Sequence, residues 1–251
     1  MSVTIKSEHE IELMREAGRL LAIKHEELHK EIKPGISTWD INRIGDTIIR
    51  DFGCTPNFLN YNGYPASICV SVNDEVVHGI PSKKRILQEG DIVSLDCGLI
   101  YKGYHSDAAR TWPVGDISPE AQRLIDVTRQ SFFEGIKFAK EGNHLYEISK
   151  AIQDYVDSFG YSIVRDLVGH GIGTHLHEDP QIPNFKPKGR GLKLQAGMTL
   201  AIEPMVNQGD YEVEWLDDDW TVVTADGSLS AHYENTVLVQ KDGCEILTLL
   251  K

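Results

Sequence analysis

The sequence predicts an α+β fold, a single domain over residues 1–251 built from two similar halves at about residues 1–115 and 116–251. Three observations support this prediction. Two amphipathic helices follow one another near the N-terminus, hydrophobic runs with strand-like alternation come after them, and parts of the first half reappear in the second. With 41% hydrophobic residues, a chain of this length can bury a substantial core without disulfide bonds.

The two helices are expected before residue 54. The first is predicted over residues 7–32, because a capping-box sequence at Ser7 and Glu10 precedes apolar residues at helical spacing. A Pro-Gly pair then interrupts the pattern. The second helix is predicted from Ser37 or Thr38 to Gly53, where a glycine follows the last residue of an apolar stripe.

An internal repeat supports the division into two halves. The segment that starts at Lys33 reads KPGISTWDINRIGDTIIRDFG, and the segment that starts at Lys140 reads KEGNHLYEISKAIQDYVDSFG. Both combine a Gly-containing turn, an aromatic residue before an acidic one, and a final Phe-Gly. The match predicts that the same helix occurs once in each half.

A second match follows at the same spacing. QEGDIVSLDCG lies over QAGMTLAIEPM and places Asp96 on Glu203, two acidic residues within apolar runs. Each half also contains His-Gly-Ile, at His78 and at His170, although the spacing there is shorter. We therefore expect the halves to pack about a pseudo-twofold axis, with ligands bound where they meet.

Composition excludes several classes of function. The net charge of −13 opposes nonspecific binding to nucleic acids and to anionic membranes. The four cysteines lack the C-x-x-C spacing of zinc fingers, and they fit a reducing cytosol. The N-terminus has charges where a signal peptide is apolar, and no segment is apolar enough to span a membrane. We expect a cytoplasmic protein.

Two aspartates are predicted to lie side by side in the first half. Residues 91–101 read as a strand with Asp96 on one face, and the turn at Lys102-Gly103 sends the chain back past Asp107. Adjacent carboxylates repel unless one takes up a proton or a cation binds between them. A turn or strand-end position is the ordinary alternative for either residue.

The second half supplies complementary groups. Glu203 ends an apolar run, Glu234 lies in the strand-like stretch AHYENTVLV, and His170 lies between glycines that permit close backbone approach. Four carboxylates and one imidazole suit Mn, Fe(II) or Co(II) better than a structural zinc site. Two divalent cations would balance four carboxylates and activate a water for amide hydrolysis.

These residues lie within strings that resemble a known family. In this order, the strings are NDEVVHGIP, SLDCGLIYKGYHSDAART, GHGIGTHLHEDPQIPNF, LAIEPM and DGSLSAHYENTVLV. They are similar to those of type I methionine aminopeptidases, whose pita-bread fold is a mostly antiparallel sheet covered by helices. The resemblance implies a metal-dependent hydrolase that removes the initiator methionine from nascent proteins when the second residue is small.

The resemblance also implies roles for the five metal-ligand candidates. Asp96 would chelate one metal, His170 and Glu203 would hold the other, and Asp107 and Glu234 would bridge the two. The metals implied are Co, Mn or Fe(II), with Zn or Ni as alternatives. A monovalent cation site is suggested near Asn73 and Ser230.

Three further roles follow from the same resemblance. Glu203 would shuttle the proton of the attacking water, His78 would contact the scissile amide nitrogen, and His177 would stabilise the developing oxyanion. From the residues alone His175 competes with His177, and the family match decides between them. The remaining histidines are read as ordinary core or surface residues: His9, His25, His29, His105, His144 and His232.

The resemblance implies a narrow, apolar pocket for the methionine side chain, because sulfur and aromatic edges attract each other. Phe58 and Leu176 depart from side chains common in the family and alter the expected pocket shape. The positions expected to bind substrate are Phe58, Tyr61, Tyr64, Cys69, His78, Leu176, His177 and Trp220.

The expected partner is the N-terminal methionine of a nascent polypeptide. The protein is expected to be a monomer that also contacts the ribosome transiently. A proline-directed enzyme of the same fold is one alternative, although such enzymes carry a large N-terminal domain and the first helix here is expected at residue 7. A non-enzymatic binding module of the same fold is another, although it predicts losses among the five ligand candidates.

Overall fold

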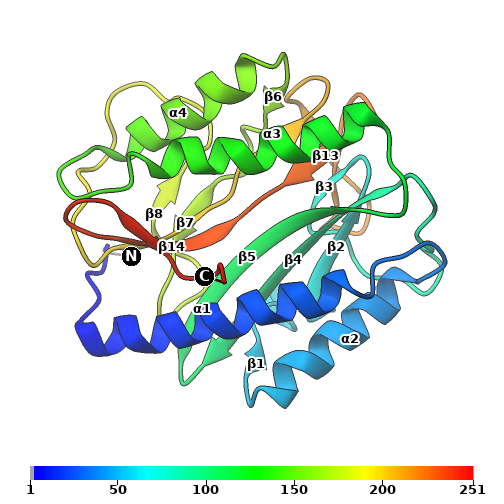
Figure 1. Ribbon diagram of the computed structural model, residues 1–251, viewed down its shortest axis with the longest axis horizontal. Helices are drawn as coiled ribbons and strands as arrows, with labels where there is room; N and C mark the ends of the chain where they lie inside the picture. Colours follow the sequence, from blue (N-terminus) through cyan, green and yellow to red (C-terminus); the bar gives the residue numbers. More distant parts are fainter. Residues whose placement is uncertain (1–2, 251) are drawn as a thin grey trace.

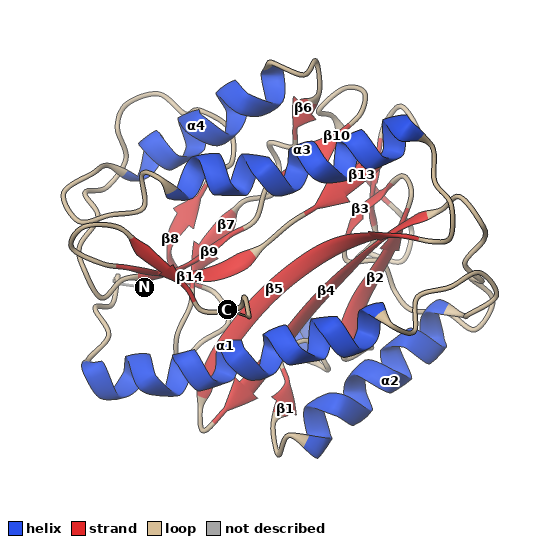
Figure 2. Cartoon of the chain, viewed as in Figure 1, coloured by secondary structure: helices blue, strands red, loops and turns tan. Residues whose placement is uncertain are grey.

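The computed structural model describes residues 3–250 as helices along two sides of a set of antiparallel strands (Figures 1 and 2). Two helices from the first half run along one side, and two from the second half run along the opposite side. The helices are α1 (Glu8–His29), α2 (Thr38–Asp51), α3 (Pro119–Ile136) and α4 (Leu145–Asp157), with a 3₁₀ turn, η1, at Tyr61–Gly63.

Two larger sheets carry most of the strands, and their neighbours pair antiparallel. In the first, β4 (Ile92–Tyr101) lies between β2 (Ile68–Val72) and β1 (Thr55–Pro56), and β5 (Tyr104–Pro113) also pairs with β4. The second has the order β15 (Cys244–Ile246), β14 (Asn235–Val239), β9 (Thr199–Ile202), β7 (Gly169–Gly171) and β8 (Glu178–Ile182).

Two smaller sheets complete the arrangement. One has the order β13 (Ser230–His232), β10 (Met205–Asn207) and β6 (Ser162–Ile163). The other has the order β11 (Val213–Trp215), β12 (Val222–Thr224) and β3 (Glu75–Val77). Because β3 comes from the first half and β12 from the second, this sheet joins the halves through backbone hydrogen bonds.

The predicted N-terminal elements are confirmed. Ser7 caps α1 and forms the capping box with Glu10, and Ser37 caps α2. The predicted hairpin is also present, because β4 and β5 pair along their whole length through the turn at residues 102–103. Local sequence signals were sufficient for these elements, since caps and tight turns depend on neighbouring residues.

The strand predicted around Glu234 is wrong in one respect. The stretch is two strands, β13 and β14, with Tyr233 and Glu234 between them. The Tyr233 amide donates to the Pro204 carbonyl at 3.1 Å, and the Glu234 amide donates to the Ala109 carbonyl at 3.0 Å. The chain changes pairing partners here, so Glu234 lies at a break in the strand.

Each pair of helices covers its own hydrophobic core. Residues of α1 and α2, such as Leu21 and Ile49, pack with Leu95 of β4 in one cluster. Residues of α3 and α4, such as Leu124 and Ile152, pack with strands of the second half in another.

Between residues 3 and 250, no helix is long and apolar enough to cross a membrane. The division near residue 115 stays a prediction.

Gly18 of α1 lies against the C-terminal segment so closely that a side chain has no space. A Cβ atom there would be 2.3 Å from the backbone oxygen of Leu247. We expect Gly18→Ala to lower the free energy of unfolding by about 1–3 kcal/mol despite alanine's higher helix propensity, because backbone must move. Urea denaturation measures the change.

Gly45→Ala is the matched control, since Gly45 is also a buried residue of a helix. Its added Cβ would meet only side-chain atoms, at 3.2 Å from Ile68 and 3.3 Å from Lys24, and these can shift. We expect the control to change stability by less than about 1 kcal/mol. Equal stabilities of the two variants would show that α1 does not pack tightly on the C-terminal segment.

Candidate metal centre and substrate pocket

One cavity of about 170 Å³ gathers every residue that was predicted from the sequence to bind divalent metal ions, act in catalysis or bind methionine. The carboxylates gather around His170, and the apolar lining residues pack together in a cluster of their own. Asn62, which was not predicted from the sequence, also lines the cavity. The full lining is Phe58, Tyr61, Asn62, Tyr64, Cys69, His78, Asp96, Asp107, His170, Leu176, His177, Glu203, Trp220 and Glu234.

The hairpin β4–β5 brings the two aspartates together. Gly98 pairs with Asp107 and Asp96 pairs with Ala109, so the two carboxylates are diagonal neighbours across the strand pair. Asp107 is buried, and its backbone is fixed by Thr236 of β14, which receives a hydrogen bond from the Asp107 amide at 3.0 Å and donates to its carbonyl at 2.9 Å. The second half therefore holds the aspartate of the first.

The ring of His170 faces carboxylates from both halves. Its Nε2 lies 3.9 Å from Asp107 Oδ2 and 3.7 Å from Glu203 Oε1. Burial, and then the charge of His177, lower the pKa of His170 to about 3, so the ring is neutral at neutral pH. Its Nδ1 donates to the Gly171 carbonyl at 2.9 Å, which leaves the Nε2 lone pair facing the carboxylates. These contacts are those of a neutral ligand and not of salt bridges.

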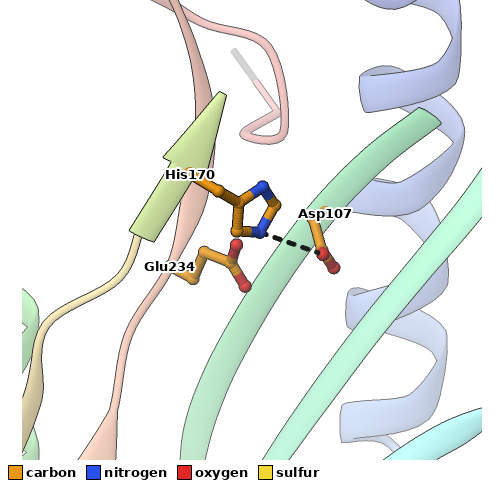
Figure 3. A group of neighbouring side chains, drawn as sticks. All are labelled: Asp107, His170 and Glu234. Carbon is orange, nitrogen blue, oxygen red and sulfur yellow. Dashed lines mark ion pairs between the residues drawn. The ribbon is translucent and has the colours of Figure 1, made fainter. Parts of the chain in front are cut away.

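Asp107, His170 and Glu234 point toward one another (Figure 3), and their ligand atoms lie within 4.8 Å of one another. Oxygens of Asp96, Asp107 and Glu234 are buried without a hydrogen-bond partner. A buried charge without a partner is strongly unfavourable, so this donor set requires a cation or protons. An oxygen-rich set with one neutral imidazole fits a divalent metal ion.

The carboxylates respond to this crowding with raised pKa values. Burial raises the pKa of Asp96 to about 7. Burial, followed by the neighbouring carboxylate charges, raises the pKa of Asp107, Glu203 and Glu234 well above the usual range. Without a cation the cluster therefore holds protons near neutral pH, and a cation that binds must displace them.

His78 stands at the side of the cavity in an unusual backbone conformation. Its φ of +59° is left-handed, which is rare for a side chain with a Cβ and occurs often at functional sites. Burial, and then the charge of His177, lower the pKa of His78 to about 4. The neutral ring meets Trp220 edge-on, with centroids 6.3 Å apart.

His177 lines the cavity but is exposed, so it lies at the mouth, and its ring is beside that of His170 with centroids 4.3 Å apart. Its Nδ1 is 2.7 Å from the hydroxyl of Tyr61. If the phenol donates this bond, the imidazole proton is on Nε2, which is then free to donate to a ligand. Tyr61 comes from the first half and His177 from the second, so the bond again joins the halves.

The apolar lining residues of the cavity pack against one another in one cluster. Phe58, Cys69 and Leu176 are buried, and the ring of Tyr64 meets Trp220 edge-on with centroids 5.1 Å apart. The Tyr64 hydroxyl donates to the Gly79 carbonyl at 2.8 Å and so needs no partner from a ligand. This apolar cluster suits an uncharged, unbranched side chain.

The structure gives contacts for His232 and for the pair Asn73 and Ser230 that were not predicted from the sequence. His232, read as an ordinary residue, is fully buried with Nε2 3.7 Å from Glu203 Oε2. Asn73 and Ser230 are adjacent, because the Ser230 amide donates to the Asn73 carbonyl at 2.9 Å. The Ser230 hydroxyl donates to Asn207 Oδ1 at 2.9 Å. A monovalent cation near this pair stays a prediction.

Comparison with known proteins decides the family, because residues 12–241 match metallopeptidase family M24. The chain belongs to this family. It is 56% identical to methionine aminopeptidase of Clostridium acetobutylicum over 247 residues, 98% of this chain and 99% of that protein. It is 51% identical to methionine aminopeptidase 1 of Bacillus subtilis over 246 residues, 98% of this chain and 99% of that protein.

Solved structures of this M24 family share the fold. Methionine aminopeptidase from Thermotoga maritima superimposes with a TM-score of 0.97 at 46% identity, covering 99% of this chain and all of that one. Xaa-Pro dipeptidase from Bacillus anthracis gives a TM-score of 0.79 at 25% identity, covering 98% of this chain but 62% of that one. The pita-bread fold and the metallopeptidase class predicted from sequence are confirmed.

The raised carboxylate pKa values of this M24 chain predict how pH affects the metal-free protein. Acids with a higher pKa in the folded state bind more protons folded than unfolded, so stability falls as pH rises through the raised values. We expect the melting temperature of EDTA-treated protein, measured from pH 7 to pH 9, to fall, because this range begins at the raised pKa of Asp96, about 7, and lies above the ordinary titration of histidine. Differential scanning fluorimetry measures it.

Glu234→Gln is the control, because it removes one of the titrating groups. Its melting temperature should fall less steeply over the same pH range. Added Co(II) or Mn(II) should stabilise the unchanged protein more at pH 9 than at pH 7, since fewer protons compete. A melting temperature that rises between pH 7 and pH 9 without metal would contradict the crowding of carboxylates.

Proposed function

We propose that this chain is a metal-dependent methionyl aminopeptidase, which removes the initiator methionine from new polypeptides whose second residue is small. The observation that carries the proposal is the cavity itself, whose lining combines an apolar cluster rich in aromatic residues with four carboxylates and the His170 imidazole. The similarity of the chain to methionine aminopeptidases over nearly its whole length supports a polypeptide with N-terminal methionine as the substrate.

Two divalent cations, of which Co(II), Mn(II) and Fe(II) suit the donors best, are proposed as the cofactors. When bound, they supply Lewis acidity toward the peptide carbonyl and lower the pKa of water. The proposed ligands, most of them buried, are Asp96, Asp107, His170, Glu203 and Glu234.

The apolar cluster that lines the cavity is proposed to hold the methionine side chain. A thioether has no charge and makes favourable contacts with aromatic edges, which Tyr64 and Trp220 present. Phe58, Cys69 and Leu176 close the walls with apolar atoms. Charged and branched side chains are disfavoured, because the first would lose hydration without compensation and the second would meet the walls.

Three side chains then act on the peptide bond. Neutral His78 is proposed to contact the scissile amide nitrogen, and His177, with its Nδ1 engaged by Tyr61, to donate from Nε2 to the carbonyl oxygen. Glu203, whose pKa burial raises, is suited to take a proton and return it to the leaving amine.

Peptide cleavage after reloading the metal-free protein tests this function. With Co(II), Mn(II) or Fe(II) added, Met-Ala-Gly-Gly should release methionine, whereas Met-Arg-Gly-Gly and Ala-Pro-Ala should not be cleaved appreciably. A large second residue displaces the carbonyl from the reactive groups, and steric misfit costs roughly 1–3 kcal/mol for each extra methylene. Released amino acids are quantified by chromatography.

Ala-Pro-Ala serves as the control for a proline-directed enzyme of the same fold. Faster cleavage of this peptide than of Met-Ala-Gly-Gly would replace the proposal with that activity. Equal rates for Ala and Arg after methionine would contradict selection by size at the second residue. Activity that survives removal of metal would contradict the metal-dependent mechanism itself.

His78→Ala separates a substrate contact from a metal ligand. Since His78 lines the cavity outside the carboxylate cluster, we expect turnover of Met-Ala-Gly-Gly to fall by about 10²-fold or more. The metal content and metal affinity should stay close to those of the unchanged protein. Calorimetric titration with Co(II) measures the affinity, and a lost metal would show that His78 is a ligand.

A further inference from the structure

The segment before α1, residues 3–7, belongs to the first half but lies against the second. We call it the N-terminal strap. The Lys6 amide donates to the Gly197 carbonyl at 2.9 Å, and Val3 packs on the hydrophobic cluster beneath α3 and α4. In Figure 1 the segment before α1 leads from that helix toward the strands of the second half.

The strap carries a buried ion pair. Lys6 Nζ lies 2.7 Å from Glu178 Oε2, and each side chain is 5% exposed. Thr4 donates its hydroxyl to the same oxygen at 2.8 Å, while Glu178 Oε1 accepts from the His175 amide at 3.2 Å. Both oxygens of the Glu178 carboxylate therefore have partners. The strap binds one oxygen, and the turn that precedes Glu178 in the chain binds the other.

That turn carries His177. Gly171 of β7 is paired with Glu178 of β8, and the Gly173 amide donates to the His175 carbonyl at 3.1 Å. A Cβ atom on Gly173 would lie 2.5 Å from Lys6 Cε and 2.6 Å from Glu178 Oε1, so the turn rests directly on the ion pair. His177 is adjacent to Glu178 in the chain, and its position depends on where this turn sits.

We propose that Lys6 is a positioning residue for the reaction, which acts through Glu178 to hold the His177 imidazole at the mouth of the cavity. Lys6 is not among the residues that line the cavity, so it does not touch a substrate there. The ion pair holds the turn from behind, while Tyr61 holds the imidazole from within the cavity. The inference rests on the proposed role of His177.

A double-mutant cycle between Lys6 and His177 tests this inference. Lys6→Met should lower kcat for Met-Ala-Gly-Gly by about tenfold, since a displacement near 1 Å costs up to about 10²-fold in rate. KM and Co(II) affinity by calorimetry should each stay within about twofold. In the His177→Ala background, the same substitution should change kcat by less than about twofold.

Two controls accompany the cycle. Lys30→Met removes the same charge from an exposed residue directly after α1 and should leave kcat unchanged, which excludes an effect of net charge. Lys6→Arg keeps the positive charge, so its kcat should lie closer to that of the unchanged enzyme than the kcat of Lys6→Met does. Circular dichroism establishes folding, and if Lys6→Met does not fold, Thr4→Val replaces it with a smaller expected loss of kcat.

The possible failures are distinct. An equal loss of kcat in both backgrounds would overturn the inference, because Lys6 would then act independently of His177. A Lys6→Met enzyme with unchanged kcat would also overturn it. If His177→Ala alone leaves kcat unchanged, the proposed catalytic role of His177 fails first, although cleavage of methionine peptides by the unchanged enzyme would still support the proposed function.

Discussion

The structure depends above all on the burial of four carboxylates at one point. Removing ionised groups from water is unfavourable by several kcal/mol each unless a counter-charge or hydrogen bonds replace the lost hydration. Asp96, Asp107, Glu203 and Glu234 lie too deep and too close for all four to stay ionised without cations. The site is consequently stable in two states, either with protons on some of its carboxylates or with metal cations bound to them.

Hydrogen bonds from neighbouring buried residues hold the backbone around the four carboxylates in place. Buried Arg110 donates to the Glu234 carbonyl, to Asn235 Oδ1 at 2.6 Å and to the Thr248 carbonyl at 3.0 Å. Its guanidinium also lies over the ring of Tyr233, 4.5 Å from the centroid. These bonds fix the break between β13 and β14, which aims the Glu234 side chain at the cluster.

Much of the fold and of the site was predictable, because the signals were local. The capping box at Ser7, the alternation around Asp96 and the turn before Asp107 each depend on residues within a few positions. The family resemblance extended the prediction to His78 and His177. Together these signals named all but Asn62 of the residues that line the cavity.

What escaped prediction depends on distant partners. The break at Glu234 arises because its amide bonds to Ala109, 125 positions earlier in the chain. His232 next to Glu203, and Lys6 next to Glu178, are likewise brought together only by tertiary packing. Residues 119–136, which form α3, were not predicted as an element. Periodicity describes one element at a time and contains no information on such pairs.

The left-handed backbone at His78 has a consequence for protein engineering. A residue with a Cβ pays about 1–2 kcal/mol in this conformation, whereas glycine adopts it freely. Stability and function therefore compete at this one position. A campaign that selects variants for heat resistance alone would favour glycine there and discard the imidazole, so an activity screen has to accompany every round of thermostabilisation.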